Sequence, residues 1–303
     1  MPKITVYEVG PRDGLQNEAA LVPVADKIAF INALSDAGAP IVEVGAFVSP
    51  KWVPQMADTE AVCLGIRRRP GVRYAALVPN ATGLDRAMAA GITDVAVFAA
   101  ASEAFSQRNI NQSIAQSLDT YRGVARRALD AGCRVRAYLS TAFGCPFQGD
   151  VPIAAVVDTT RALLDTGAYE VAVSDTIGIA HPGQVRKVLA ALLAAVPVQQ
   201  IALHFHDTRG TALANVLASL DFGVTTFDAS AGGLGGCPYA PGATGNLATE
   251  DLLYLLHGLG LETGVSLDAV YAASTAIEPV VGHVLPSRYV RARAATATPP
   301  RNG

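Results

Sequence analysis

The chain alternates short apolar segments with longer segments of helical periodicity, and it repeats this pattern eight times. The first unit places ITVYEVG (4–10) before a helical stretch near 24–37. The strand-like segments are apolar and β-branched almost throughout, which is typical of parallel strands covered on both faces. The pattern therefore predicts an α/β fold in which eight parallel strands close into a (β/α)₈ TIM barrel. A doubly wound open sheet is the alternative that the pattern leaves open.

The other expected elements follow in strict alternation along the chain. Further strands are expected at 41–47, 73–79, 94–101, 134–141, 170–176, 201–207 and 225–231. The helices that follow them are expected near 55–68, 82–90, 111–131, 151–166, 182–195, 210–222 and 247–258. Because no linker interrupts these units, residues 1–285 are predicted to form a single barrel domain with a short C-terminal helical extension. Residues 286–303 are predicted to be a flexible tail.

The composition argues against several classes of function. The 303 residues carry a net charge of −3, which gives no overall attraction for nucleic acid. No apolar run approaches the roughly 20 residues of a spanning helix, so no membrane association is expected. The N-terminus resembles neither a signal peptide nor a transit peptide, and four cysteines are too few for a disulfide framework. We therefore expect a cytoplasmic protein with reduced thiols.

Polar side chains gather where the predicted strands end, which in such a barrel is the edge that carries the active site. These candidates are Arg12, Asp13, Glu43, Asp175, His204, His206 and Asn246. Within them, the triplet HFH (204–206) is the most informative. Residues i and i+2 of a strand share a face, so both imidazoles can point into the barrel. A single strand histidine is more often a satisfied core residue, but a pair opposite a carboxylate predicts a divalent metal site.

A glycine-rich stretch, GGLGGCPYAPGATGN (232–246), follows the eighth expected strand. Its many glycines predict a mobile loop rather than a packed element. Cys237 lies in the middle of this loop, where a thiol is exposed and becomes reactive if a neighbour lowers its pKa. The alternative is a merely flexible connection that holds an incidental thiol.

Six segments together resemble the hydroxymethylglutaryl-CoA lyases, a metal-dependent branch of the TIM barrels that also contains Claisen-type synthases. The segments are VGPRDGLQNE (9–18), FVSPKWVPQMAD (47–58), GCPFQGD (144–150), SDTIG (174–178), HFHDTRGTALAN (204–215) and GGLGGCPYAPGATGNLATEDL (232–252). The Cys237 loop with its continuation NLATEDL is the most specific of them. The resemblance implies cleavage of 3-hydroxy-3-methylglutaryl-CoA to acetyl-CoA and acetoacetate. It implies an acyl-CoA substrate, Mg²⁺ or Mn²⁺ as the cofactor, and a homo-oligomer.

The resemblance also implies roles for the candidate residues. The metal would be held by Asp13, His204, His206 and Asn246. Arg12 would stabilise negative charge at the thioester carbonyl, and Cys237 would take part in protonating the leaving carbanion. The base that removes the hydroxyl proton would be His204 or Asp13. Glu43 and Asp175 would either act as active-site carboxylates or orient His and Arg side chains, and Gln16 would line the substrate pocket.

Some residues depart from the family pattern. Gly45 and Ala46 follow the glutamate of the second strand, where the family has small hydroxylated residues, and Arg209 replaces an aromatic residue after HDT. These changes bear on the acyl chain rather than on the reaction. A lyase for a related ester such as citramalyl-CoA is the nearest alternative. A Claisen-type synthase and a non-catalytic barrel that binds metal or CoA esters are more distant ones.

Overall fold

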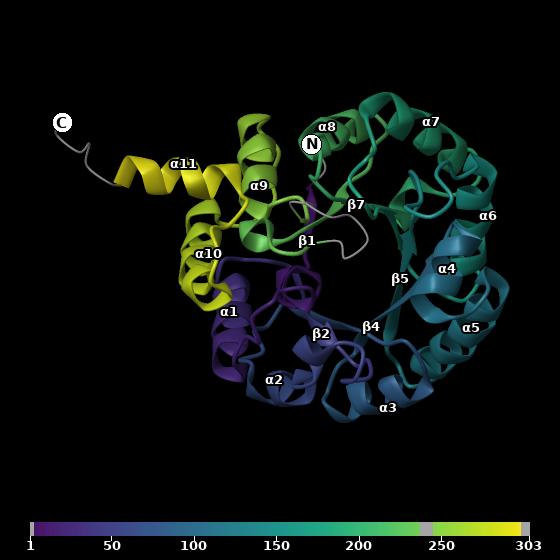
Figure 1. Cartoon of the computed structure of the whole chain (residues 1–303), viewed down its shortest axis with the longest axis horizontal. Coiled ribbons are helices and arrows are strands. Elements are labelled where there is room, and N and C mark those ends of the chain that lie inside the picture. Colours follow the sequence, from purple (N-terminus) through teal and green to yellow (C-terminus); the bar gives the residue numbers. More distant parts are fainter. Residues whose placement is uncertain (1–2, 237–244, 298–303) are drawn as a thin grey trace.

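Eight parallel strands close into a barrel in the computed structural model, which describes residues 3–236 and 245–297 (Figure 1). The strands are β1 (Thr5–Glu8), β2 (Ile41–Ala46), β3 (Arg73–Leu77), β4 (Asp94–Ala100), β5 (Arg134–Ser140), β6 (Val171–Asp175), β7 (Ile201–Phe205) and β8 (Thr226–Ala229). They follow chain order around the barrel, and β1 pairs with both β2 and β8. The predicted TIM barrel is therefore confirmed, and the open sheet is excluded because a closed sheet has no edge strand.

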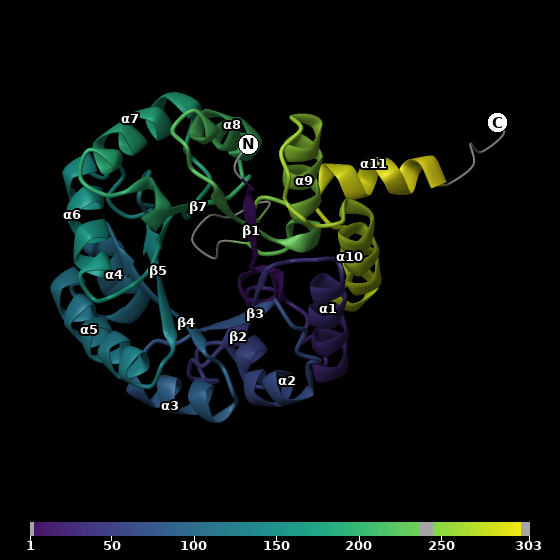
Figure 2. The same cartoon turned by 180° about the vertical axis from the view of Figure 1, so that it is seen from behind.

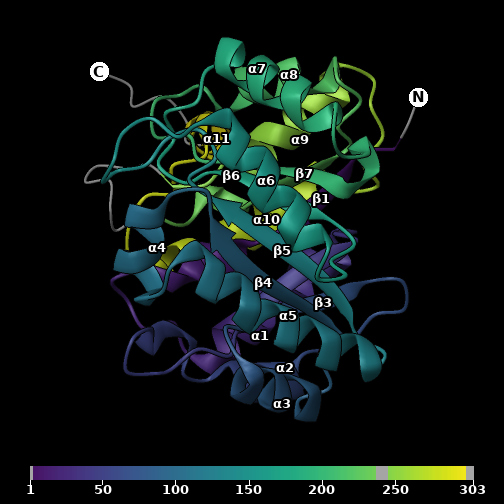
Figure 3. The ribbon, with the colours of Figure 1, turned by 90° about the vertical axis from the view of Figure 1, so that its right-hand side faces the viewer.

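Helices form an outer ring around these strands (Figures 1 and 2). The ring consists of α1 (Val24–Asp36), α2 (Thr59–Gly65), α3 (Ala81–Ala89), α4 (Glu103–Ile110), α5 (Ile114–Asp130), α6 (Ile153–Leu164), α7 (Pro182–Leu193), α8 (Ala212–Leu220) and α9 (Thr249–Gly258). Helices α5 and α6 pack against β4 and β5, as the side view in Figure 3 shows. Both faces of each strand are thus covered, which accounts for its apolar sequence. Within the described residues, no helix combines the length and the apolar character needed to cross a membrane.

Helix α4 was not predicted. The sequence pattern indicated a helix near 111–131, which corresponds to α5, and none in the residues before it, where α4 forms. Side-chain caps mark the starts of both helices. The side chain of Ser102 accepts a hydrogen bond from the backbone of Phe105 and starts α4, and Asn111 ends it in a left-handed conformation. Ser113 then forms a capping box with Gln116 that starts α5. The polar residues between the helices are therefore cap signals.

The C-terminal region adds α10 (Leu267–Val281) and α11 (Arg288–Ala297) to one side of the barrel (Figure 1). Helix α10 packs against α1 and α9, and α11 packs against α9. Helix α11 occupies part of the segment for which the sequence predicted a flexible tail. Its first turn is capped by the carboxylate of Asp251, which accepts hydrogen bonds from the backbone N–H groups of Arg288 and Tyr289 at 3.0 and 2.8 Å. A cap supplied by a distant helix is not visible in the local sequence.

Candidate active site

A single π-helical turn, Gly10–Gly14, follows β1 and presents the Arg12–Asp13 pair at the carboxyl end of the barrel. Two glycines let this turn lie against its neighbours. A Cβ atom on Gly10 would lie 2.7 Å from Oε1 of Glu8, and one on Gly14 would lie 2.7 Å from Oγ of Ser230. Any larger residue at these positions would push the turn away from the end of β8. The sequence GPRDG thus positions the side chains of Arg12 and Asp13 at the carboxyl end of the barrel.

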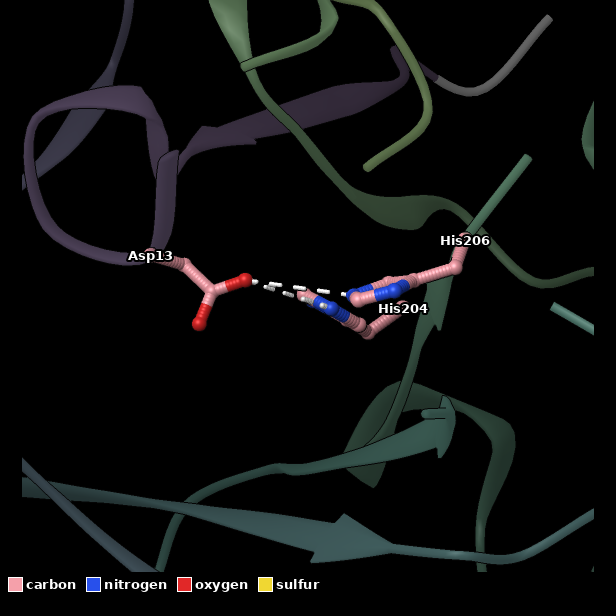
Figure 4. A group of neighbouring side chains, drawn as sticks. All are labelled: Asp13, His204 and His206. Carbon is pink, nitrogen blue, oxygen red and sulfur yellow. Dashed lines mark ion pairs between the residues drawn. The ribbon is translucent and has the colours of Figure 1, made fainter. Parts of the chain in front are cut away.

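Asp13 faces both histidines of the HFH triplet (Figure 4). Its Oδ2 atom lies 3.9 Å from Nε2 of His204 and 3.9 Å from Nε2 of His206. One potential ligand atom from each of the three residues lies within 4.8 Å of the other two. The three residues predicted to hold the metal thus lie together, and an oxygen and two imidazole nitrogens suit a divalent cation.

A short extension of the sheet brings Asn246 to the same place. Strand β7 ends at Phe205, the middle residue of the HFH triplet. The last residue of the triplet, His206, forms an isolated antiparallel bridge with Asn246. The backbone N–H of Leu247 donates to the carbonyl of Phe205 at 2.9 Å. The side-chain Nδ2 of Asn246 donates to Oδ2 of Asp13 at 2.9 Å. All four predicted metal ligands are therefore neighbours.

Two polar atoms at this point are buried and have no hydrogen-bond partner among the described residues. They are Oδ1 of Asn246 and Nδ1 of His206. A buried polar atom without a partner is costly, so it usually indicates a water, an ion or a ligand. The amide oxygen is a favoured ligand of hard cations such as Mg²⁺. The residues present thus fit a divalent metal.

The charge states of the group also favour cation binding. Burial alone would raise the pKa of Asp13, but the guanidinium of Arg12 and the two imidazoles lower it to about 2. Burial, with the charge of His204, lowers the pKa of His206 to about 4. Near pH 7 Asp13 is therefore an anion, and His206 is neutral and keeps a lone pair.

Arg12 lies between two carboxylates. Its Nε donates to Oε2 of Glu43 at 2.6 Å, and its Nη1 donates to Oδ1 of Asp13 at 2.5 Å. The guanidinium lies over the ring of Tyr138, with 5.1 Å between Cζ and the ring centroid. Although burial opposes it, the charges of Glu43 and Asp13 raise the pKa of Arg12 well above its ordinary value. The side chain is thus a fixed positive charge beside the candidate metal ligands.

Glu43 is fully buried in β2 and orients Arg12. Its Oε2 accepts hydrogen bonds from Arg12 and from the hydroxyl of Tyr138, the latter at 2.9 Å. Burial raises the pKa of Glu43, against the lowering effect of Arg12. Its Oε1 is buried and has no hydrogen-bond partner among the described residues. Of the two roles considered for this carboxylate, these contacts favour orientation of the arginine.

Asp175, at the end of β6, stabilises the loop that follows this strand. Its two oxygens accept hydrogen bonds from the backbone N–H groups of Ile179 and Ala180, both at 3.0 Å. Burial raises the pKa of Asp175 to about 6, although these bonds and His204 oppose the shift. Asp175 thus shapes the loop after β6, and its hydrogen bonds do not join it to Arg12 or to the histidines.

Two predicted residues remain, Gln16 and Cys237. Oε1 of Gln16 is buried and has no hydrogen-bond partner among the described residues, so it is available to a ligand. Its neighbour Asn17 donates from Nδ2 to the carbonyl of Gly236 at 2.8 Å, which ties the β1 turn to the start of the glycine-rich loop. Cys237 lies outside the described residues.

Gly45 and Arg209, two of the departures from the family pattern, have neighbours outside the metal group. A Cβ atom on Gly45 would lie 2.7 Å from Oγ1 of Thr59, so this glycine faces α2. The hydroxyl of Thr59 donates to the carbonyl of Ala46 at 3.1 Å. Arg209 donates from Nη1 to the carbonyls of Ile177 and Gly178 and thereby joins two loops.

Three buried residues near the metal group were not predicted. Asp228 contacts His204, Arg136 contacts Asp228, and Tyr138 contacts Glu43. A signal was present, since Arg136 and Asp228 are charged residues inside otherwise apolar strands, and buried charges require partners. The strand pattern alone does not say which charges meet across the barrel.

The sequence and the structure are similar to those of known lyases. Residues 3–277 match the HMGL-like protein family. Hydroxymethylglutaryl-CoA lyase YngG of Bacillus subtilis is 52% identical over 286 residues, which cover 94% of this chain and 96% of that protein. The 3-hydroxy-3-isohexenylglutaryl-CoA/hydroxy-methylglutaryl-CoA lyase of Pseudomonas aeruginosa is 52% identical over 295 residues, which cover 97% and 98%. The crystal structure of hydroxymethylglutaryl-CoA lyase from Pseudomonas aeruginosa matches with a TM-score of 0.95 at 52% identity, covering 97% of this chain and 98% of that one.

Proposed function

The chain belongs to the HMGL-like family, and from this premise we propose that it cleaves 3-hydroxy-3-methylglutaryl-CoA to acetyl-CoA and acetoacetate. The observation that carries the proposal is the convergence of Asp13, His204 and His206 on one point at the carboxyl end of the barrel. The fixed guanidinium of Arg12 lies directly beside it. A retro-Claisen cleavage needs this pairing, because negative charge develops first at the hydroxyl oxygen and then at the thioester enolate.

Asp13, His204, His206 and Asn246 would hold Mg²⁺ or Mn²⁺. Carboxylate, amide and imidazole donors suit these ions, and the partnerless Oδ1 of Asn246 supports the assignment. A bound divalent cation would supply Lewis acidity, which makes an alcohol easier to deprotonate.

Arg12 would serve the thioester end of the substrate. Its Nε and Nη1 are used by Glu43 and Asp13, whereas Nη2 makes no hydrogen bond with the described residues. This nitrogen is the donor that we assign to the thioester carbonyl. Because two carboxylates fix the guanidinium, it needs no reorganisation when the enolate forms.

Two protons must move in this reaction. The tertiary hydroxyl loses one, and the candidate bases are Asp13 and His204: the low pKa of Asp13 makes that carboxylate a weak acceptor, and His204 could accept only through Nε2 while that atom holds no cation. The other proton must reach the carbanion carbon, and we assign this step to the thiol of Cys237. The link between Asn17 and Gly236 supports a loop whose start is anchored at the β1 turn.

A panel of CoA esters incubated with Mg²⁺ or Mn²⁺ and scored for acetyl-CoA release tests the proposal. The panel contains 3-hydroxy-3-methylglutaryl-CoA, 3-hydroxy-3-isohexenylglutaryl-CoA and citramalyl-CoA. The second ester is included because the Pseudomonas aeruginosa relative is named for it. We expect the highest kcat/KM for the first ester and loss of activity after treatment with a chelator. Binding of the esters without acetyl-CoA release would contradict the proposal.

The homo-oligomeric state and the cytoplasmic location remain predictions.

A further inference from the structure

The two histidines of the metal group have different surroundings. Nδ1 of His204 lies 3.1 Å from Oδ2 of Asp228, whereas Nδ1 of His206 is buried and has no hydrogen-bond partner among the described residues. Asp228 lies in β8 directly beside His204 in the strand register, and only 1% of its surface is exposed. One imidazole therefore has a fixed partner behind it and the other does not.

Arg136 holds Asp228 in place from the other side. Its Nη2 donates to Oδ1 of Asp228 at 2.6 Å, and its Nη1 donates to Oδ2 at 3.1 Å. The same guanidinium donates from Nε to Glu170 at 2.9 Å and lies 3.9 Å from the ring centroid of Tyr7. Such a two-pronged contact fixes the plane of the carboxylate as well as its charge.

The chemistry of this contact decides the tautomer of His204. A carboxylate paired with a guanidinium is an anion and can only accept hydrogen bonds. The hydrogen of neutral His204 must therefore sit on Nδ1, which leaves the lone pair on Nε2. That atom lies 3.9 Å from Oδ2 of Asp13, on the side where the cation would bind.

We propose that Asp228, held by Arg136, is a positioning residue that keeps His204 in its metal-binding tautomer and orientation. The inference rests on the proposed metal site and adds residues that do not themselves touch metal or substrate. Carboxylates that accept a hydrogen bond from a ligating histidine act in this way in other metal sites.

The first test uses two isosteric variants that differ in their contact with His204. In Asp228→Asn the amide nitrogen takes the place of Oδ2 and donates to Nδ1 of His204. The ring hydrogen then moves to Nε2, so that this nitrogen has no lone pair for the cation. Glu170→Gln also removes a carboxylate from Arg136, but Glu170 does not contact His204. By titration calorimetry, Asp228→Asn should bind Mn²⁺ about 10- to 100-fold more weakly than the unmodified protein. Glu170→Gln should stay within about twofold. An equal loss in both variants would overturn the inference, because it would mean that the network only supports the barrel.

The second test reads the tautomer of His204 directly, and its main result comes from the unmodified protein. The chain has five histidines, so the ring nitrogens of metal-free protein labelled with ¹⁵N-histidine can be assigned with single-histidine variants. His204 should show a protonated Nδ1 and an unprotonated Nε2, and Asp228→Asn should reverse this pattern. A protonated Nε2 in the unmodified protein would overturn the inference. If the unmodified protein binds no Mn²⁺ but His204 has the expected tautomer, the proposed metal site fails and the positioning contact stands.

Discussion

Oε2 of Glu43 accepts a 2.6 Å hydrogen bond from Nε of Arg12 at a point where both side chains are buried. The same oxygen accepts the hydroxyl of Tyr138 at 2.9 Å, so one carboxylate atom sets the position of the guanidinium. The direction of Arg12 is therefore fixed by β2 and β5, although the residue itself belongs to the turn after β1.

Replacement of Glu43 should show how much the orientation of Arg12 contributes to the rate. In Glu43→Gln the side chain no longer carries the charge that anchors Arg12, and a displacement of about 1 Å of a catalytic group typically costs about 100-fold in rate. We expect kcat to fall by about this factor while Mn²⁺ affinity changes little. Tyr138→Phe removes a single hydrogen bond to the same oxygen and should cost less than about tenfold. Steady-state kinetics and calorimetry would check both, and a loss of Mn²⁺ affinity as large as the loss of kcat would contradict this role.

Arg12→Lys keeps the positive charge but removes the planar fork. A lysine ammonium cannot bond to Glu43 and Asp13 and also present a separate donor to the substrate in a fixed plane. We expect kcat to fall by about 100- to 1000-fold, the usual effect of losing one preorganised donor to an oxyanion. The measurement is acetyl-CoA release at saturating substrate and Mn²⁺. A variant within threefold of the original rate would exclude Arg12 from this role.

The repeat of strand and helix patterns was sufficient to predict the barrel, because every strand lies between two covering layers and is apolar for that reason. The ends of elements were less predictable. His206 lies beyond β7 in a bridge to Asn246, a pairing between segments 40 residues apart in sequence. Helix α11 begins where Asp251 caps it. In both cases a contact from elsewhere in the fold decides the outcome.

Some residues of the site were also more predictable than others. The metal group could be predicted because its members lie at strand ends and follow simple spacing rules, such as the two histidines on one face of a strand. The residues that support the metal group could not be predicted from the sequence. Arg136 and Asp228 are 92 residues apart and meet across the barrel, and only the three-dimensional register of β5 and β8 places them together.

His206→Ala should weaken metal binding without unfolding the barrel. The residue supplies one of the converging nitrogens, and its Nδ1 has no hydrogen-bond partner among the described residues, so no hydrogen bond of that atom is lost with it. We expect Mn²⁺ affinity to fall by about 100-fold or more, at least as much as for loss of an indirect partner. His257→Ala is the matched control, because His257 lies in the last turn of α9, where it contacts Thr263 and none of the predicted metal ligands. Equal Mn²⁺ affinity in the two variants would contradict the assignment of His206.

Cys237→Ser tests the assigned proton donor. A serine hydroxyl is a much weaker acid than a thiol, so it should transfer a proton to the carbanion less readily. We expect normal Mn²⁺ affinity and a kcat that is lower by about 100-fold, within the usual range for loss of a general acid. Cys133→Ser is the control, since Cys133 lies just before β5 at the opposite end of the barrel. A Cys237→Ser rate equal to the control rate would remove Cys237 from the mechanism.

Glu250 gives a prediction about stability and pH. Its carboxyl group is fully buried, with Oε2 2.9 Å from the backbone N–H of Gly232 and Oε1 bonded to the hydroxyl of Ser274. Burial raises the pKa of Glu250 to about 8, although these hydrogen bonds oppose the shift. The folded protein therefore binds this proton more tightly than the unfolded chain does. The resulting stabilisation is complete below the pKa of the unfolded chain and is lost as the pH rises through about 8.

We therefore expect the free energy of unfolding to fall as the pH rises from 6.5 to 9, and to fall less in Glu250→Gln, which stays neutral. Urea unfolding in the presence of a chelator at several pH values measures the difference between the two proteins. Burial also raises the pKa of Glu8, to about 7, but Glu8 is present in both proteins, so only its charge coupling to Glu250 differs between them. The low pKa of His206 acts mainly below pH 6.5, outside the chosen range. Identical slopes for the two proteins would mean that the Glu250 carboxyl does not take up a proton on folding.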